Sequence, residues 1–367
     1  MDQKKTNWLS VTMIAGAWVS FCIGSGFATG QELLQYFGAY GALGFGSIIV
    51  GMILHGYSSA SFLKLGNEQH FHNPMDVFDY YCGKTFGKLF KLLSVFFLLL
   101  SPIVMIAGFG AALNQHFGAP LSVGAAVVGI LCIITILLGL KKMVEILGFI
   151  GPVIIFITLF TGGIYLIQHW ELLVDGMSIA PQESSLRMGT NWVDSGILYA
   201  AWAPMISAPF LVASATTVKS PRDAALGGIV GTIFYGLACV MMVAAFFCNY
   251  VVIGKQAVPT LYLANTISPL LGYAFLAVIF LGIYSSAVPS LFTFCATFFK
   301  EGTTQHRIFT VAAVAAATII SVTVPFGTLL NWVYTFYGYL GMLFFVLMAV
   351  KQIRVAKERK SIQNQGQ

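Results

Sequence analysis

The sequence predicts an all-α polytopic membrane protein with ten transmembrane helices in two halves of five. Apolar runs near twenty residues recur along the 367-residue chain, and each could cross a hydrocarbon core of about 30 Å. Only 9% of the residues are charged and 58% are hydrophobic, against about 25% charged in a soluble domain. Because the runs are far too long for barrel strands, helices are the expected spanning element.

The predicted spans are, in chain order, 8–37, 41–65, 86–114, 120–140, 145–168, 191–216, 222–251, 269–300, 305–324 and 326–350. The long runs at 86–114 and 269–300 indicate tilted helices. The first run opens at Trp8 without a small-residue cleavage site after a short core, so we expect no cleaved signal peptide. We expect residues 1–367 to form one transmembrane domain, with a basic and then Gln-rich tail over 351–367 that frays at the inner leaflet.

The basic residues test this topology through the positive-inside rule. With the N-terminus inside, the outer segments hold two of the nineteen basic residues, Arg187 and Lys255, and the inner segments hold the other seventeen. The inner residues are Lys4, Lys5, Lys64, Lys84, Lys88, Lys91, Lys141, Lys142, Lys219, Arg222, Lys300, Arg307, Lys351, Arg354, Lys357, Arg359 and Lys360. This split predicts a cell membrane protein of the bacterial cytoplasmic membrane, with both termini cytoplasmic.

The same charge distribution argues against a nucleic-acid partner. The net charge is +6, but the positive residues lie in short loops between apolar runs. The expected partners are the lipid bilayer and a small-molecule substrate. The six cysteines are scattered without a CxxC pair, which is typical of small buried hydrophobic residues rather than of a metal site or a disulfide.

The two halves cover residues 8–168 and 191–350, which are 161 and 160 residues long. An odd number of spans in each half makes the second half enter the membrane from the opposite side. This is the arrangement of an inverted repeat.

Helix breakers occur in the first span of each half. The first carries GSGFATGQE at 24–32, where each mid-helix glycine costs about 1 kcal/mol relative to alanine; close helix packing would also use such residues. The second carries AWAPMISAPF at 201–210, where Pro204 and Pro209 each remove a backbone donor. Matching breakers predict unwound backbone that faces a cavity near the membrane centre. Free amides there could hold a carboxylate, and free carbonyls could hold a cation.

The motif GSGF at 24–27 resembles the glycine motif in helix 1 of the amino acid–polyamine–organocation superfamily, whose members share the LeuT fold. The longer string GSGFATGQE, the ten spans and the basic tail most resemble the YkvI-type membrane proteins within it. The resemblance implies a bundle of helices 1, 2, 6 and 7 that rocks against a scaffold of helices 3, 4, 8 and 9.

The resemblance also implies a sodium site between helices 1 and 8. Gly282, Ser285 and Ser286 fit the helix 8 pattern of sodium-coupled members, and the helix 1 carbonyls would be those of Ser20 and Ile23. Such a set of oxygen ligands without a carboxylate suits Na⁺ as the coupling ion, and no other cofactor is expected. The alternative is that the serines bond to their own backbone. Proton-coupled relatives often carry a lysine in helix 5, and the span 145–168 has none.

Glu32 is the one acidic residue of thirteen that lies within a span rather than in a loop or at a span end. Six helical residues beyond Gly26, or about 9 Å of rise, it would share a cavity-lining face with Ser25 and Thr29. An intramembrane carboxylate is a functional-site hypothesis. Glu32 could attract a cationic group of the substrate, carry a coupling proton, or brace neighbouring helices. We expect Gln31 to brace the helix break.

The candidate solute-binding residues surround the two breaks. They are Gly24, Ser25, Gly26, Phe27, Glu32, Phe109, Tyr199, Trp202, Ala203, Pro204 and Met205. A substrate carboxylate would meet the amides around Ser25 and Gly26, and its cationic end would approach the carbonyls after Trp202. Tyr199 and Trp202 could form an aromatic lid or serve packing alone. The candidate gating or coupling residues are Gln31, Glu32 and Pro209.

Three further features allow simpler interpretations. His55 is the one histidine near the membrane centre, and packing is the favoured role. Tyr334 and Tyr337 are explained by an outer aromatic belt. The loop 252–268 could cover an outer vestibule or be a plain surface loop.

These patterns favour a Na⁺-coupled symporter of an amino acid or related small zwitterion that works by alternating access. A quaternary amine or a nucleobase-like solute fits the same features, as does proton coupling, exchange or export. A transporter-like sensor is a second class. A membrane enzyme is a third, but the chain has no HExxH motif and no phosphate-binding loop.

Overall fold

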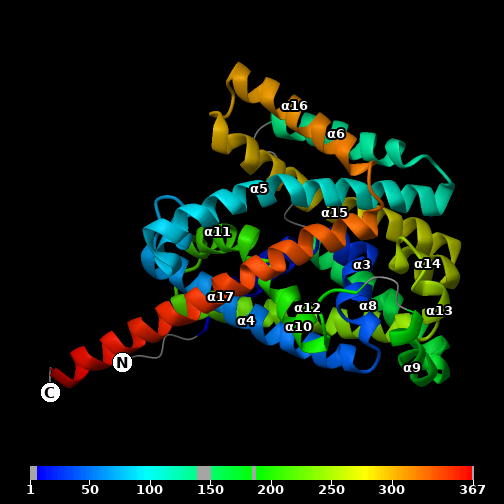
Figure 1. The fold of residues 1–367 in the computed structure, drawn as a ribbon, viewed down its shortest axis with the longest axis horizontal. Coiled ribbons are helices and arrows are strands. Elements are labelled where there is room, and N and C mark those ends of the chain that lie inside the picture. Colours follow the sequence, from blue (N-terminus) through cyan, green and yellow to red (C-terminus); the bar gives the residue numbers. More distant parts are fainter. Residues whose placement is uncertain (1–5, 139–149, 184–186, 366–367) are drawn as a thin grey trace.

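The computed structural model describes residues 6–138, 150–183 and 187–365, and their regular structure is helical (Figure 1). In the first half the main helices are α1 (Trp8–Cys22), α2 (Ser25–Thr29), α3 (Gln31–Tyr36), α4 (Leu43–Gln69), α5 (Asp76–Phe117), α6 (Leu121–Leu138), α8 (Ile150–Gln168) and α9 (Leu173–Glu183). In the second half they are α10 (Trp192–Ala201), α11 (Pro204–Ser214), α12 (Pro221–Phe247), α13 (Tyr250–Ile253), α14 (Pro259–Ile267), α15 (Pro269–Phe298), α16 (Thr304–Ser321) and α17 (Phe326–Gln365).

Six helices of the described chain are long and apolar enough to cross a membrane: α4, α5, α6, α12, α15 and α17. Two bent pairs raise this number to eight if each pair is one span: α8 with α9, bent by 81°, and α10 with α11, bent by 46°. The first predicted span appears as the short helices α1, α2 and α3, and the ninth as the 18-residue α16. The exact number of ten spans and the inverted repeat therefore stay predictions. Residues 145–149 of the fifth predicted span lie outside the described residues.

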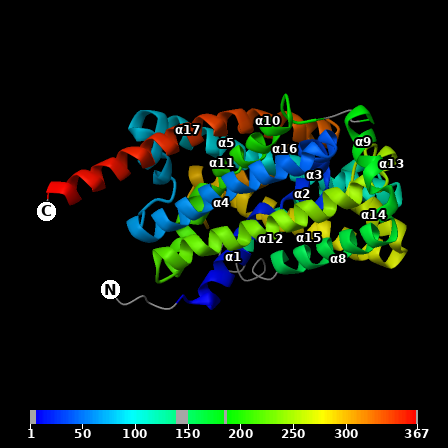
Figure 2. The ribbon, with the colours of Figure 1, turned by 90° about the horizontal axis from the view of Figure 1, so that it is seen from below.

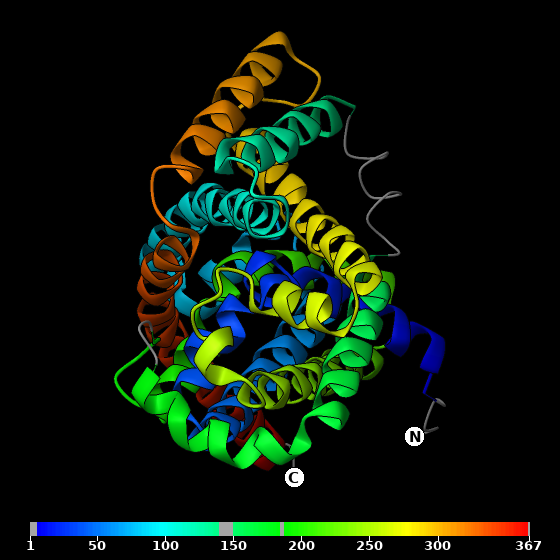
Figure 3. The same ribbon diagram turned by 90° about the vertical axis from the view of Figure 1, so that its right-hand side faces the viewer.

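The helices pack in two groups. In the first, α12 packs against α1 and α4, and α10 packs against α4. In the second, α5 packs against α15 and α6, and α16 packs against α6 and α5. Figure 3 shows α6 and α16 at the outer edge of the molecule, beyond α5 and α15. This division agrees with the bundle and scaffold that the resemblance implies.

Two predicted boundaries are wrong because helices continue through polar sequence. The segment 66–85 separates the second and third predicted spans, but α5 begins within it at Asp76 and bends at Gly83, whose φ is 73°. The tail after Val350 was expected to fray, but α17 continues to Gln365. Figure 2 shows that the end of α17 projects beyond the bundle, toward the same end of the molecule as the start of α1.

Candidate functional site

The first break lies between α1 and α2. Ile23 has φ −79° and ψ 84°, and Gly24 has φ −92° and ψ −166°, so the backbone is extended where the sequence predicts unwinding. A second interruption follows at Gly30, whose φ of 85° is left-handed and separates α2 from α3. Glycine reaches this region without a Cβ penalty. The two interruptions leave a five-residue helix at the centre of the bundle.

The second break is a bend rather than an unwound stretch. Trp202 and Ala203, between α10 and α11, keep right-handed helical dihedrals. Pro204 occupies the first position of α11, where its missing amide removes no helical hydrogen bond. Pro209 lies inside α11 without ending it. Both predicted breaks therefore interrupt a helix, the first with extended backbone and the second with a bend of 46°.

Glu32 folds back against Gly26 of α2. The prediction that it shares a continuous helical face with Ser25 and Thr29 is wrong, because Gly30 interrupts the helix between them. A Cβ added at Gly26 would lie 2.0 Å from Glu32 Oε1 and 2.3 Å from its Cδ. Only 1% of Glu32 is exposed, and its Oε2 is buried without a hydrogen-bond partner among the described residues.

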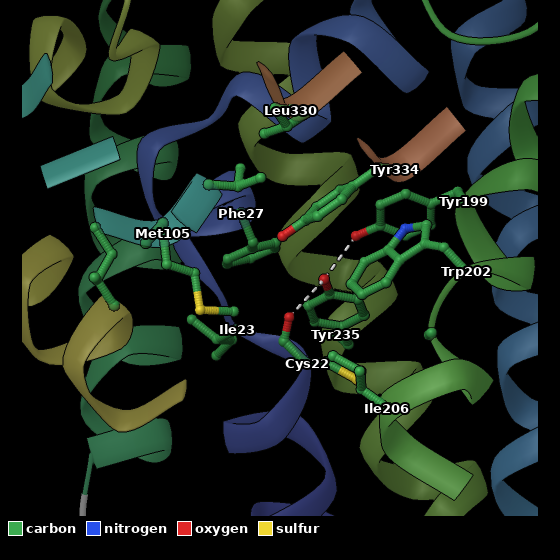
Figure 4. Close-up of a cluster of buried hydrophobic side chains, with 14 of the residues drawn as sticks. Cys22, Ile23, Phe27, Met105, Tyr199, Trp202, Ile206, Tyr235, Leu330 and Tyr334 are labelled. Carbon is green, nitrogen blue, oxygen red and sulfur yellow. Dashed lines mark hydrogen bonds between the residues drawn. The ribbon is translucent and has the colours of Figure 1, made fainter. Parts of the chain in front are cut away.

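Three buried tyrosine hydroxyls lie near this carboxylate. Glu32 lies within electrostatic range of the hydroxyls of Tyr199, Tyr235 and Tyr334. Figure 4 shows the rings of Phe27, Trp202 and these three tyrosines facing a common centre. We call these five residues the aromatic cluster.

Contacts within the aromatic cluster fix its geometry. The Trp202 ring stacks on Tyr334 with centroids 4.6 Å apart, and the Phe27 ring lies 5.0 Å from Tyr235. The Tyr199 and Tyr235 hydroxyls are 2.6 Å apart, and Tyr235 donates to Cys22 O at 3.5 Å. Tyr235 was not predicted to lie here. Tyr334 was assigned to an outer belt, which is wrong because its exposure is 0%.

A small cavity lies beside the aromatic cluster. It offers about 10 Å³ to the centre of a water molecule, which is near the minimum that holds one water. It is lined by Phe21, Cys22, His55, Trp202, Ala203, Ile206, Ser207 and Tyr235. The centre of the bundle is therefore almost closed in this structure.

His55 packs among rings and also lines that cavity. Its centroid lies 5.4 Å from the ring of Tyr199, 5.9 Å from Trp18 and 6.2 Å from Tyr235. Its ring nitrogens are buried without a hydrogen-bond partner among the described residues. The packing role predicted from sequence agrees with these contacts.

The loop 252–268 packs against the second interruption, around Gly30, and its predicted role as the cover of an outer vestibule stays a prediction. Thr260 Oγ1 of α14 donates to Ala28 O at 2.7 Å, and Gln31 Nε2 donates to Gln256 O at 2.8 Å. Gln115 of α5 holds both the amide and the carbonyl of Val258, at 2.8 and 2.9 Å. We call the end of the bundle where α3, α14 and the start of α17 meet the α14 end.

A chain of side-chain amides continues this closure from α3 to α17. Gln35 Nε2 donates to Gln31 Oε1 at 2.8 Å and to Gly327 O at 3.1 Å. Asn331 Nδ2 donates to Gln35 Oε1 at 3.1 Å. We call Gln31, Gln35 and Asn331 the amide chain. It agrees with the bracing role expected for Gln31, and it adds Gln35, which the sequence analysis missed.

Part of the predicted ion site is brought together. Ser286 Oγ of α15 donates to Ile23 O at 3.1 Å, directly at the first break. A Cβ added at Gly282 would lie 3.7 Å from Ile23 Cγ2. The hydroxyls of Ser285 and Ser20 instead donate to backbone carbonyls of their own helices, those of Gly282 and Gly16.

Gly108, and not the predicted Phe109, is the residue of α5 that approaches the first break. Phe109 packs against Phe280 of α15 with centroids 5.2 Å apart. Its neighbour Gly108 approaches the break instead, since a Cβ there would lie 3.0 Å from Ser25 Cβ. Met105 also contacts the break, at 3.2 Å from a Cβ added at Gly24. On the other side of the cluster, Met205 O accepts a hydrogen bond from Ser94.

Fold and site together define a multi-pass α-helical membrane protein of the LeuT fold, with an interrupted first span over a central aromatic and carboxylate site. A Na⁺-coupled sialic acid symporter, solved in a substrate-bound, outward-open state, matches with a TM-score of 0.62 and 13% identity over 95% of this chain and 82% of that chain. A likeness at this identity concerns the fold.

The predicted resemblance to YkvI is confirmed. The uncharacterised membrane protein YkvI of Bacillus subtilis (strain 168) is 21% identical over 379 aligned positions, which cover 99% of this chain and 100% of that protein. The uncharacterised protein YyaD of the same organism is 29% identical over 133 positions, or 36% of this chain and 38% of that protein. No family model matches the chain.

Proposed function

We propose that this protein is a secondary active transporter that couples the movement of an amino acid or related small organic solute to sodium by alternating access. The observation that carries the proposal is the interrupted first span, which brings extended backbone at Ile23 and Gly24 and the buried carboxylate of Glu32 close to the aromatic cluster. Interrupted helices of this kind form the substrate and ion sites of transporters with inverted repeats. The fold shared with a sodium-coupled symporter supports the same proposal.

Sodium is the proposed coupling ion because hard oxygen donors meet at the break. The Ile23 carbonyl and the Ser286 hydroxyl are 3.1 Å apart, and Ser285 lies on the same helix with a hydroxyl that can rotate from the Gly282 carbonyl toward them. The proposed site is completed by the carbonyls of Ser20 and Gly282. The Ser286 hydrogen bond also links α15 to the break.

The test is thermal unfolding of the detergent-purified protein in NaCl and in equimolar choline chloride. A ligand that binds the folded state alone stabilises it by about 2.7 kcal/mol at one hundred times its dissociation constant. We expect sodium to raise the midpoint of wild type, and the double variant Ser285→Ala/Ser286→Ala to lose that rise. Thr293→Ala is the matched control, since this exposed hydroxyl of α15 bonds its own helix at Pro289 O. A full sodium effect in the double variant would contradict the site.

Glu32 favours a second candidate, a proton-coupled or exchange transporter. A buried carboxylate without a basic partner can carry a proton through the transport cycle. In proteoliposomes, this candidate requires uptake that follows an imposed pH gradient in the absence of sodium, and that disappears in Glu32→Gln. Sodium-driven uptake without any effect of the pH gradient excludes it.

A further inference from the structure

A groove follows the line where α4 and α12 meet on the surface of the molecule. The two helices lie side by side (Figure 2). The groove encloses about 680 Å³. Along α12 its lining begins at Ala225 and ends at Val240, which corresponds to about 22 Å of helical rise.

Apart from one lysine at its end, the lining of the groove is uncharged and mostly apolar. Four of its side chains are more than half exposed: Ile49, Ile53, Ile233 and Leu237. Gly56 also lines the groove, and a Cβ there would meet only Thr232 Cγ2, at 3.8 Å. The Thr232 hydroxyl is already bonded within its own helix, since it donates to Gly228 O at 2.8 Å. In a chain that crosses a bilayer, a surface of this kind meets lipid tails, which are as apolar as leucine.

The shape of the groove favours a lipid tail over a helix of another protein. Its 680 Å³ spread over about 22 Å give a mean cross-section of about 30 Å², whereas a helix 10 Å in diameter needs about 80 Å². An extended hydrocarbon chain is one methylene wide and is far narrower than a helix. The groove therefore has room for an acyl chain along its length.

Two cations lie at one end of this groove. Lys64 belongs to its lining on α4. On α12, Arg222 lies three residues before Ala225, on the same helical face. A Cβ on Gly228 would lie 3.0 Å from Ala60 N, and four residues farther toward this end of each helix Lys64 is level with the first turn of α12. The predicted topology puts this end of the groove at the inner leaflet.

Both cations are available to a ligand. Lys64 and Arg222 are exposed. The ion pairs of the described residues do not include Arg222, and Lys64 pairs with Glu68 at 4.0 Å, where an exposed pair is worth at most about 1 kcal/mol. The neighbouring Asp223 is bonded on the α1 side instead, since its Oδ2 accepts from Asn7 N at 3.2 Å.

We infer that this groove binds an anionic phospholipid, with one acyl chain between α4 and α12 and the headgroup phosphate at Lys64 and Arg222. An apolar groove with two cations at one end matches a molecule with a long tail and an anionic head. Arginine matches the geometry of phosphate oxygens, and basic pockets between spans at the cytoplasmic side bind anionic headgroups. The site is separate from the central one and does not depend on the solute that is transported.

The experiment titrates the delipidated full-length protein in detergent with phosphatidylglycerol or phosphatidylethanolamine that carry the same palmitoyl and oleoyl chains. Bound lipid is counted by native mass spectrometry. We expect phosphatidylglycerol to bind at least tenfold more tightly. Lys64→Gln/Arg222→Gln should lower its affinity at least fivefold and leave phosphatidylethanolamine unchanged. Lys300→Gln/Arg307→Gln is the matched control, since it removes the same two charges from exposed positions beside α15 and α16.

Gly56→Leu tests the place of the acyl chain, because its side chain would extend into the groove from a position with little contact. It should weaken the binding of both lipids at least fivefold. Equal affinities for the two lipids overturn the inference, as does undiminished binding of phosphatidylglycerol in Lys64→Gln/Arg222→Gln or an equal loss in the control. A lipid-free dimer that Gly56→Leu dissociates would make a second copy the occupant, and oleate that binds as tightly as phosphatidylglycerol would make it a free fatty acid; either result overturns the inference. If Gly56→Leu does not fold, the two charge variants decide alone.

Discussion

Glu32 and Gly26 act as a pair, because the glycine leaves room for the carboxylate. A methyl group at residue 26 would lie within 2.3 Å of three atoms of the Glu32 side chain, and both residues are buried. Overpacking of this kind costs about 1–3 kcal/mol. The carboxylate would have to leave its position against the break.

We therefore expect Gly26→Ala to destabilise the protein by about 1–3 kcal/mol in the presence of Glu32. In a Glu32→Ala background the same substitution should cost much less, since the atoms it meets are gone. Thermal unfolding of the four variants in this double-mutant cycle measures the coupling. Gly16→Ala in α1 is the control, because a Cβ there meets nothing within 4 Å. Additive effects in the cycle would contradict the contact.

Among elements, α14 depends on the left-handed glycine between α2 and α3. A Cβ on Gly30 would lie 2.7 Å from the Phe246 ring and 2.8 Å from Thr260 Cγ2. The close approach lets Thr260 donate to Ala28 O. A side chain at this position would separate α14 from the break.

We expect Gly30→Ala to lower the unfolding midpoint well beyond the effect of backbone strain alone. Gly302→Ala isolates that strain, since Gly302 has a similar φ of 83° and open space around its Cα. The left-handed penalty of about 1–2 kcal/mol is common to both, and the collision with α14 belongs to Gly30→Ala alone. Equal unfolding midpoints for the two variants would show that α14 does not pack closely against Gly30.

The amide chain is the second element that holds the α14 end closed. Gln35 donates two hydrogen bonds and accepts one, linking α3 to α17. Each bond contributes about 0.5–1.5 kcal/mol. Gln35→Ala should therefore raise the fraction of molecules whose α14 end is open roughly tenfold or more.

The readout is the rate at which a membrane-impermeant maleimide labels Thr29→Cys, in a background whose six native cysteines are replaced by alanine. Thr29 is fully buried under this end. Thr266→Ala should leave the rate unchanged, since its hydroxyl bonds the α14 backbone at Tyr262 O. An unchanged labelling rate in Gln35→Ala would show that the amide chain does not hold the α14 end closed.

The sequence predicts a helix interruption best where the residue type itself disfavours a helix. Gly24 and Pro204 remove helical preference locally, so the positions of both interruptions follow from composition. Tyr334 and Gln35 could not be placed, because a tyrosine near a span end fits a membrane interface or a buried site equally well, and a glutamine reveals its role through partners distant in the chain. The position of the Glu32 side chain against Gly26 depends on the left-handed φ of Gly30. A prediction from helical periodicity assumes that Gly30 continues the helix, so it misplaces Glu32.

For the whole molecule, the proposed alternating-access cycle assigns the two helix groups and their closed α14 end to one of its states. The fold relative was solved outward-open, whereas α14 and the amide chain here bond to α2 and α3. The predicted topology puts this end outside. Solute exchange at that side then requires α14 and α3 to separate, which involves the hydrogen bonds named above.

The number of spans is testable at α16, whose 18 residues separate two exposed loops. Six, eight or ten spans are all even numbers, so each places both termini on one side, and labelling the termini cannot distinguish them. The loops can: if α16 crosses the membrane, Gly302 lies inside and Thr323 lies outside. Both residues are exposed in the structure.

We expect Thr323→Cys to react with an impermeant maleimide in intact cells, and Gly302→Cys to react only after the membrane is permeabilised. Each substitution is made in the cysteine-free background, with protein amount measured by an antibody against a C-terminal tag. The basic residues Lys300 and Arg307 flank the first loop, and the positive-inside rule holds such short loops in the cytoplasm. Labelling of both positions from the same side would show that α16 lies on the membrane surface and does not cross it. The distribution of basic residues would then require an odd number of spans or a further span elsewhere.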